Sequence, residues 1–463
     1  MPFIGDQAWF YLSARDSMQS HTIPLVGITS SHTWLHQGPL WTYLLMIVFS
    51  ITKYNPVAPG YFTAFFGVLT TYLMYITGKN IFSKRVGLIA ASLFAFSPLA
   101  IFYSRMPYHT SLIPFFTTLF ILVFYKWILG NIKYLPVVFL LLGILYNFEL
   151  ATVLFVYLFL IYFIFGKLRH ANWVTSIKLK DFSISLILLI ISLMPVIFYD
   201  IQNGFPQTLK FAAWNAVQLA GILGIHLKKF EVPPESMQDV VSFFFFQYRR
   251  LIFLPSLFVS VLLFIFSIIG TGYVLIHGIK NKMNNRNHFF IFFSSLVLLL
   301  GFFAARTRSE AYLPMIFPFV IFLLAITFDL MMGYRKIKLA ITLFIFLMLT
   351  SNALFLIHKN YFAFKAENQE GFIYGPGIKR LTEQSNLIVL DANKKSFNLI
   401  GGGFLHDGSG MDNFEYLVWY LGGNISALSK TSYVVYPEHL AAKEKNIIYY
   451  DEYIKIVRKT SGK

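Results

Sequence analysis

The sequence contains no cysteine and few charged residues. Without cysteine, the chain has no disulfide, no thiolate metal site and no cysteine nucleophile. Charged residues make up 13% of the 463 residues, against about 25% in soluble domains, whereas 57% are hydrophobic and 19% aromatic. With a mean hydropathy of +0.63, the composition predicts a polytopic membrane protein. It excludes a secreted enzyme, an ordinary nucleic-acid binder and a disordered scaffold.

Long apolar runs dominate the first three quarters of the chain. A membrane-spanning helix needs about 20 mostly apolar residues. The runs predicted to span are 57–77, 86–104, 109–127, 134–149, 150–166, 183–201, 251–278, 288–305, 311–332 and 339–357. A shorter run at 38–52 is expected to lie at the membrane interface. The sequence therefore predicts an all-α polytopic fold with about ten transmembrane helices and one interfacial helix.

Basic residues gather in alternate loops between these predicted spans. The loops lie at 79–85, 126–133, 167–180, 280–286 and 335–338. Because short basic loops stay on the cytoplasmic side, the net charge of +17 reflects membrane orientation and not a nucleic-acid partner. Eight of the ten acidic residues before position 358 fall on the other side. We therefore expect a multi-pass protein of the cell membrane whose active side is extracytoplasmic.

Two long segments lie outside the predicted spans. The segment 202–250 is expected to form an outer loop, and the tail 358–463 has 13 basic and 11 acidic residues, an ordinary soluble balance. Within the tail, 386–391 and 432–436 are expected to form buried strands of a small extracytoplasmic α/β domain. The remainder, 1–357, is expected to be a transmembrane module in which 1–56 form an outer catalytic loop and the interfacial helix.

Three outer segments carry ionisable groups beside predicted helices, where such groups often serve function. Asp6 stands at the start of a helix, either as a cap or as a working carboxylate. His36 precedes a Gly-Pro helix start and could meet an anion there, or it could be an interfacial histidine among aromatic anchors. Arg105 could bind a phosphate bidentately or extend to lipid headgroups.

The same segments contain motifs that carry a family resemblance. They read Asp6-Gln7-Ala8-Trp9-Phe10-Tyr11, Ile23-Pro24-Leu25, His36-Gln37-Gly38-Pro39-Leu40, Ser104-Arg105 and Leu112-Ile113-Pro114-Phe115-Phe116. In their order, spacing and common membrane face they resemble the polyprenyl-phosphate-sugar-dependent glycosyltransferases of the GT-C superfamily. That superfamily includes the protein O-mannosyltransferases and the aminoarabinose transferase of lipid A, both like glycosyltransferase family 39. The resemblance covers roughly residues 5–130.

The resemblance implies an inverting transfer of a sugar from a polyprenyl-phosphate-linked donor to an acceptor hydroxyl of a protein, glycan or lipid. It assigns the general base to Asp6, and we expect Arg105 to hold the donor phosphate with help from His36 or His109. Two positions depart from the family pattern. Gln7 stands where the family has a second acid, and Thr110 stands where it has an aspartate after the arginine.

Further residues expected on the outer side are candidates for the functional site, and each also has a purely structural interpretation. The pair Arg306 and Arg308 suits a lipid phosphate or headgroup anchoring, and Glu149 could contact the acceptor or cap a hairpin. Tyr108, beside His109, completes the candidate acceptor contacts together with Gln7 and Thr110. No histidine and acid cluster has metal-ligand spacing, so no cofactor is predicted and a divalent metal has no support from the sequence.

Two other functions stay open. A transporter or flippase for a lipid-linked or anionic solute would place ionisable residues at the membrane midplane and would show matching broken helices in two halves. Here the acids collect at one face, which favours the transferase. A non-catalytic, degenerate GT-C homologue would also explain the two departures from the family pattern.

Overall fold

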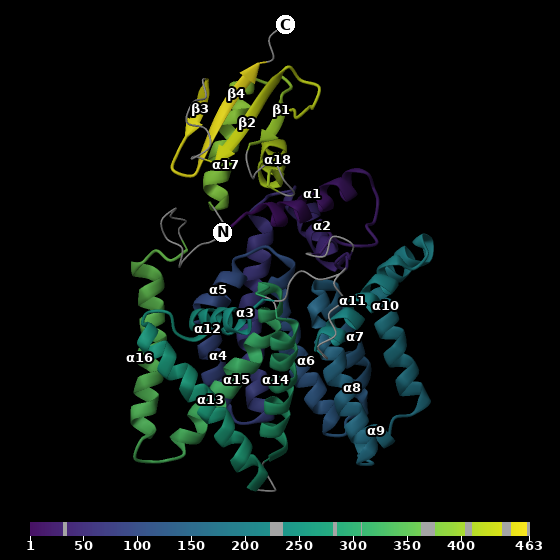
Figure 1. Ribbon diagram of the computed structural model, residues 1–463, viewed down its shortest axis with the longest axis vertical. Coiled ribbons are helices and arrows are strands. Elements are labelled where there is room, and N and C mark those ends of the chain that lie inside the picture. The colour runs from purple at the N-terminus through teal and green to yellow at the C-terminus, as the bar shows by residue number, and fades with distance from the viewer. Residues whose placement is uncertain are drawn as a thin grey trace.

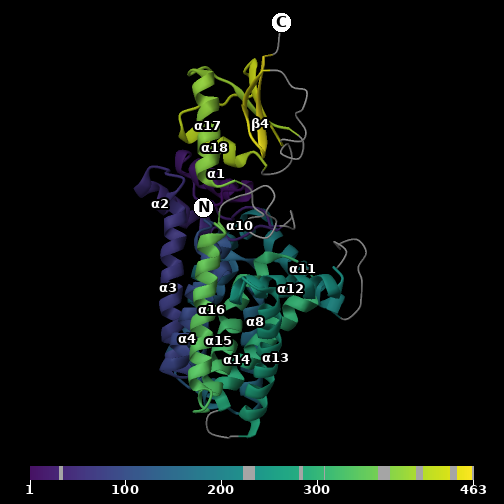
Figure 2. The ribbon, with the colours of Figure 1, turned by 90° about the vertical axis from the view of Figure 1, so that its left-hand side faces the viewer.

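The computed structural model describes residues 1–30, 35–222, 235–280, 285–306, 308–362, 376–402, 410–437 and 446–460. Residues 223–234 of the predicted outer loop, and Thr307 between the two candidate arginines, lie outside the described residues. The molecule is a helical bundle with a small strand-containing domain stacked on one end, and α1 (Gly5–Gln19) lies between the two (Figures 1 and 2).

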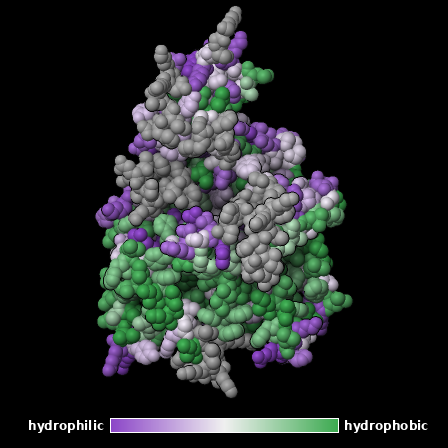
Figure 3. All heavy atoms as spheres, in the orientation of Figure 1, coloured by the Kyte–Doolittle hydropathy of each residue, from purple (hydrophilic) through white to green (hydrophobic). Residues whose placement is uncertain are grey.

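The bundle is built from the apolar runs of the sequence. Its helices are α2 (Leu40–Thr52), α3 (Ala58–Ile81), α4 (Lys84–Ala95), α5 (Pro98–Ser104), η1 (His109–Leu112), α6 (Ile113–Ile128), η2 (Ile132–Tyr134), α7 (Leu135–Phe148), η3 (Leu150–Thr152), α8 (Val153–Leu168), α9 (Asn172–Thr175), α10 (Leu179–Asn203), α11 (Pro206–Ile222), α12 (Met237–Ile252), α13 (Leu257–Lys280), α14 (Asn285–Ala305), η4 (Glu310–Tyr312), α15 (Leu313–Met332) and α16 (Lys338–His358). An apolar belt surrounds the bundle on the face that Figure 3 shows.

Among the described residues, six helices are long and apolar enough to cross a membrane, or up to eight if each bent pair counts as one span. The bent pairs are α4 with α5, at 67°, and α12 with the first part of α13, at 101°. The first bend falls at Ser97-Pro98, because proline cannot continue a preceding helix and Ser97 caps the next one. The polytopic helical fold is confirmed, and the count of about ten spans stays a prediction.

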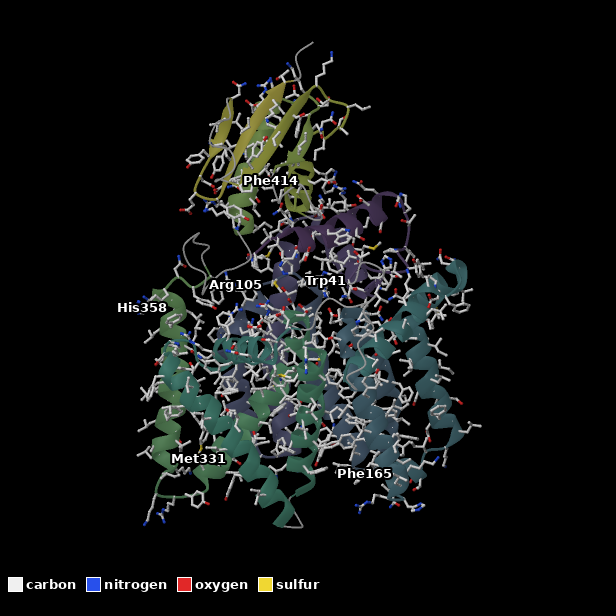
Figure 4. The ribbon with its side chains drawn as sticks, in the orientation of Figure 1. Trp41, Arg105, Phe165, Met331, His358 and Phe414 are labelled. Atoms are coloured by element: carbon white, nitrogen blue, oxygen red, sulfur yellow. The ribbon has the colours of Figure 1, made fainter. Side chains whose placement is uncertain are left out.

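Charge separates the two ends of the bundle. Phe165 and Met331, beside two of the predicted basic loops, lie at the end far from the C-terminal domain (Figure 4). At that end Arg85 pairs with Asp329 at 3.1 Å. Arg105 and Trp41 lie at the opposite end, close under α1 (Figure 4). The candidate residues of the amino-terminal segments therefore gather at the end that carries the C-terminal domain.

The C-terminal domain combines two helices with one four-stranded sheet. Its elements are α17 (Ile378–Ala392), β1 (Asn398–Gly401), α18 (Asp412–Tyr420), β2 (Thr431–Pro437), β3 (Ile447–Tyr450) and β4 (Ile454–Thr460). The strand order is β1-β2-β4-β3, with β1 parallel to β2 and the other pairs antiparallel. The strand predicted at 432–436 is confirmed by β2. The strand predicted at 386–391 is wrong, because these residues belong to α17.

The prediction at 386–391 was wrong because it considered only a short run of residues. The run Leu-Ile-Val-Leu is typical of a buried strand, but the buried residues of α17 are spaced by three and four along the whole helix. They are Ile378, Leu381, Gln384, Ser385, Ile388 and Ala392. This spacing puts them on one face of a helix.

The C-terminal domain docks on α1 and α2 through α18. The ring of Tyr416 is fully buried and lies 5.1 Å from the ring of Tyr11 and 5.8 Å from that of Phe49. The guanidinium of Arg15 pairs with Glu415 at 3.3 Å. Helix α1 is therefore held between α2 and α18, and its position depends on both.

Candidate functional site

A buried polar cluster joins three segments beneath α1. Glu149 follows α7, His109 opens η1, and Gln37 ends the segment that leads into α2. The Nε2 atoms of Gln37 and His109 lie 3.2 and 3.3 Å from the same Glu149 oxygen, Oε2. Glu149 is 8% exposed and His109 is 3% exposed. Of the sequence candidates, the structure thus brings His109 and Glu149 into direct contact.

Local backbone geometry explains why these side chains meet. Gly27 and Gln37 form a short antiparallel ladder, in which Gly27 N donates to Gln37 O at 2.8 Å and Gln37 N donates to Ile28 O at 2.9 Å. Gly38 packs directly on Asn147 of α7, where a Cβ would lie 2.3 Å from the Asn147 Oδ1 atom. Glycine at this position lets the Gln37 side chain reach the end of α7.

Glu149 also ends one helix and starts the next. Its backbone is extended, with φ of −156° and ψ of 129°, so α7 stops at Phe148. Its Oε1 atom accepts a hydrogen bond from the Ala151 amide at 3.4 Å, as an N-cap carboxylate does. The structural alternative considered from the sequence, a hairpin cap, is therefore present in the structure.

Asp6 lies in the first turn of α1 and is exposed. Negative charge is favoured at this end of a helix because of the helix dipole. Burial raises the pKa of the half-buried Tyr108, and the nearby carboxylates of Asp6 and Glu149 raise it further. The Tyr108 hydroxyl therefore lies within the field of both acids. Gln7 is buried, and its Oε1 atom accepts a hydrogen bond from Ile4 N at 3.2 Å.

Arg105 follows α5 and is half-buried. Its guanidinium lies 4.4 Å from the centre of the Phe362 ring, a cation–π contact. In the described part of the chain, no carboxylate forms an ion pair with Arg105. Its charge is thus available to an anion that displaces or shares the Phe362 contact.

The other candidates lie around this cluster. His36 contacts Gly27 O through Nδ1 at 3.2 Å and packs on Tyr199, so it faces α10 and not Glu149. Thr110 is buried in η1. Arg308 pairs with Glu235 at 2.9 Å, and the Arg306 carbonyl accepts a hydrogen bond from the Glu235 amide. Both arginines stand just before η4, and Arg308 already has a carboxylate partner in Glu235.

Sequence reasoning missed a second buried charge, Arg250 of α12. Its side chain is 2% exposed, Nη1 lies 3.8 Å from Glu310 and 3.2 Å from Gln247, and Nε donates to the Tyr361 hydroxyl at 3.3 Å. The signal available was Arg249-Arg250 at the end of an amphipathic run. We expected 202–250 to be an outer loop, so this pair was not considered. Among the described residues, no group of three or more histidine and acidic side chains is placed to hold a metal ion.

Comparison with known proteins gives one sequence match and several structural ones. Residues 36–199 match the family model described as dolichyl-phosphate-mannose-protein mannosyltransferase. No curated protein matches the chain by sequence. The family match covers the Gln37 segment, Arg105, His109 and Glu149.

The structural matches extend over nearly the whole chain. ArnT from Cupriavidus metallidurans bound to undecaprenyl phosphate matches with a TM-score of 0.61 at 8% identity, covering 98% of this chain and 94% of that chain. Its apo form gives 0.62 at 10% identity, covering 98% and 93%. The oligosaccharyltransferase AglB from Archaeoglobus fulgidus, in complex with an inhibitory peptide and a dolichol-phosphate, gives 0.52 at 15% identity, covering 94% and 66%.

The structural matches show the fold. It is the fold of the ArnT structures over nearly the full length of the chain. The resemblance found in the amino-terminal motifs is confirmed by the mannosyltransferase family match over 36–199 and by this fold.

Proposed function

We propose that the protein transfers a sugar from a polyprenyl-phosphate-linked donor to an acceptor hydroxyl, with inversion at the anomeric carbon. Support comes from the family match and from structural neighbours whose descriptions name undecaprenyl phosphate and dolichol-phosphate. The observation that carries the proposal is that exposed Asp6 and Arg105, which forms no ion pair with a carboxylate among the described residues, lie at the same end of the bundle.

In the proposed reaction, the acceptor oxygen attacks the anomeric carbon from the side opposite the phosphate. The bond from that carbon to the phosphate oxygen breaks, and its electron pair leaves with the lipid phosphate. Asp6 accepts the proton of the acceptor hydroxyl, a step that general-base catalysis accelerates by about 10²–10⁴-fold. Arg105 stabilises the charge that develops on the leaving phosphate. Because Asp6 is exposed, it can pass the proton to solvent after each turnover.

The lipid of the donor needs an apolar surface next to the phosphate site. A shallow apolar groove lies between α12 and α15, with Phe244, Leu251, Ile316, Phe317 and Val320 in its lining. Helix α5, which ends just before Arg105, contacts α12 through Phe102 and Arg250. We propose that the part of the lipid nearest the phosphate contacts this apolar surface.

We further propose that the site faces the extracytoplasmic side. The basic loops beside Phe165 and Met331 lie at the end far from the C-terminal domain and from α1, which carries Asp6 (Figures 1 and 4). Short basic loops are retained in the cytoplasm, so the opposite end, with Asp6, is on the outer side.

A transfer assay tests this function. Three forms of the full-length protein are purified and compared: wild type, Asp6→Asn and Asp16→Asn. Each is placed in a native lipid extract and supplied with radiolabelled polyprenyl-phosphate sugars. Asp16 is a matched control, because it is an exposed acid on the same helix that pairs with Arg15 at 2.7 Å. We expect transfer by wild type and by Asp16→Asn, and loss in Asp6→Asn.

Other results would redirect the proposal. Transfer by Asp6→Asn at the wild-type rate would remove Asp6 from the mechanism. A wild type that binds the donor without transfer would indicate a non-catalytic homologue. A wild type that neither binds nor transfers would favour the transporter.

A further inference from the structure

The cluster of Gln37, His109 and Glu149 takes no part in the transfer step described above. Glu149 and His109 are almost completely buried, whereas a base or a phosphate ligand must be reached by substrate. Burying a carboxylate costs several kcal/mol unless hydrogen bonds compensate. Here three N–H groups do so, from Gln37, His109 and Ala151. The carboxylate is thus tied into the framework of the site.

Glu149 also controls the orientation of the imidazole. The Nδ1 atom of His109 is buried and has no hydrogen-bond partner among the described residues. The contact from Nε2 to Glu149 is therefore the polar contact that fixes the ring. Without it, only packing against neighbouring rings would hold His109 in place.

Those neighbouring rings lead to Asp6. The centre of the His109 ring lies 5.2 Å from that of Phe10 and 4.1 Å from that of Tyr108. Phe10 is four residues after Asp6, so both lie on the same face of α1. The rings of Phe10 and Tyr108 are themselves 5.9 Å apart. His109 therefore supports α1 one turn away from the proposed base.

We propose that Glu149 is a positioning residue, which acts through His109 to hold α1 and Tyr108 and thereby places Asp6 for proton transfer. This inference rests on the proposed function, in which Asp6 is the base. In this proposal Glu149, the second acid of the site, holds the neighbouring side chains in position and does not transfer a proton. Gln37 links Glu149 to the segment before α2. A displacement of about 1 Å at a reacting group can lower the rate about 100-fold.

The test compares Glu149→Gln with Asp451→Asn in the full-length protein. Asp451 is a matched control, because its carboxylate also accepts several hydrogen bonds, from Tyr449, Gln384 and Ile454, but in the C-terminal domain. We expect Glu149→Gln to lower kcat about 10–100-fold while the KM for the donor changes less than about threefold. Hydrogen exchange in residues 5–19 should become faster. Asp451→Asn should change neither kcat nor that exchange.

The conservative substitution of the histidine separates positioning from direct contact. His109→Gln keeps an N–H that can donate to Glu149, so it should retain most of the wild-type kcat, whereas His109→Leu should not. A rise in donor KM at constant kcat would overturn the proposal, because it would place the cluster in contact with the donor. Equal loss of kcat in both His109 variants would also overturn it.

Hydrogen exchange of α1 does not require catalytic activity, so it tests this proposal even if the sugar-transfer assay shows no activity. If wild type transfers no sugar, the proposed function fails, but faster exchange of α1 in Glu149→Gln would still establish the coupling. Unchanged exchange of α1 would refute it. If Glu149→Gln does not fold, Gln37→Leu removes one of the three N–H donors and should speed exchange of α1 in the same way.

Discussion

Replacing Asp412 with asparagine should strengthen the docking of the C-terminal domain on α1 at neutral pH and leave it unchanged at acidic pH. Burial, together with the nearby carboxylates of Glu415 and Asp6, raises the pKa of Asp412 from 3.8 to about 6. A raised carboxylate pKa means that the docked state favours the protonated acid. The cost of the ionised acid therefore appears as pH rises through the window between 3.8 and about 6.

The size of this effect follows from the shift. Two pKa units correspond to about 3 kcal/mol, but Asp412 is only partly buried, and solvent screening reduces such a figure. Asp412 also stands in the first turn of α18, where the helix dipole favours a carboxylate by about 0.5 kcal/mol that asparagine loses. The expected net gain at pH 7.5 is about 1 kcal/mol, or about a fivefold lower opening constant.

Hydrogen exchange of the α18 amides at pH 7.5 and pH 4.0 measures this constant, with variant and wild type compared at each pH. We expect exchange in Asp412→Asn to be about fivefold slower at pH 7.5 and nearly unchanged at pH 4.0. Glu452→Gln is the control, because this exposed acid of the same domain pairs with Arg380 and not with a residue of α1 among those described. The reasoning would fail if Asp412→Asn exchanged faster at pH 7.5, or if the two pH values gave the same ratio.

Two further substitutions test the packing that supports the site. Gly38→Ala places a Cβ 2.3 Å from the Asn147 Oδ1 atom and 2.6 Å from its Cα, so we expect about 1–3 kcal/mol of destabilisation by thermal unfolding, and an unchanged midpoint would contradict the packing. Arg250→Met leaves Glu310 without its cation and should cost about 3–5 kcal/mol. The double variant Arg250→Met with Glu310→Gln should recover most of that loss, and additive losses instead would show that the two residues are not coupled.

Local sequence patterns predicted the parts of the fold that depend on short-range physics. The apolar runs gave the helices of the bundle, and the short run at 38–52 corresponds to α2, next to α1 under the C-terminal domain. The strand at 432–436 was predicted because a short run of β-branched and aromatic residues is typical of a buried strand, and Tyr433, Val434 and Val435 are buried in β2. The run at 386–391 failed because hydrophobicity in a short window does not separate a strand from a buried helix.

Local sequence patterns also failed to predict which single residues meet in the site. The motif pointed to His36, but the side chain on Glu149 is that of its neighbour Gln37, because the ladder with Gly27 and Ile28 decides which way each side chain faces. Arg250 was missed because its burial depends on Glu310, 60 positions later, and on Tyr361. Such long-range pairings have no periodic signature in the sequence.

The two acids nearest Tyr108 differ in the property that decides what a carboxylate can do. Asp6 is exposed on the first turn of α1, so it can take a proton from a hydroxyl and release it to water. Glu149 is buried and accepts from three N–H groups, and protonating it would weaken bonds that hold Gln37, His109 and η3 together. A general base must change its protonation state in every turnover, and a group whose hydrogen bonds form the framework of the site cannot do so without disturbing that framework. These environments support the proposal that Asp6 transfers the proton and that Glu149 positions Asp6, although the sequence offers both acids as candidates.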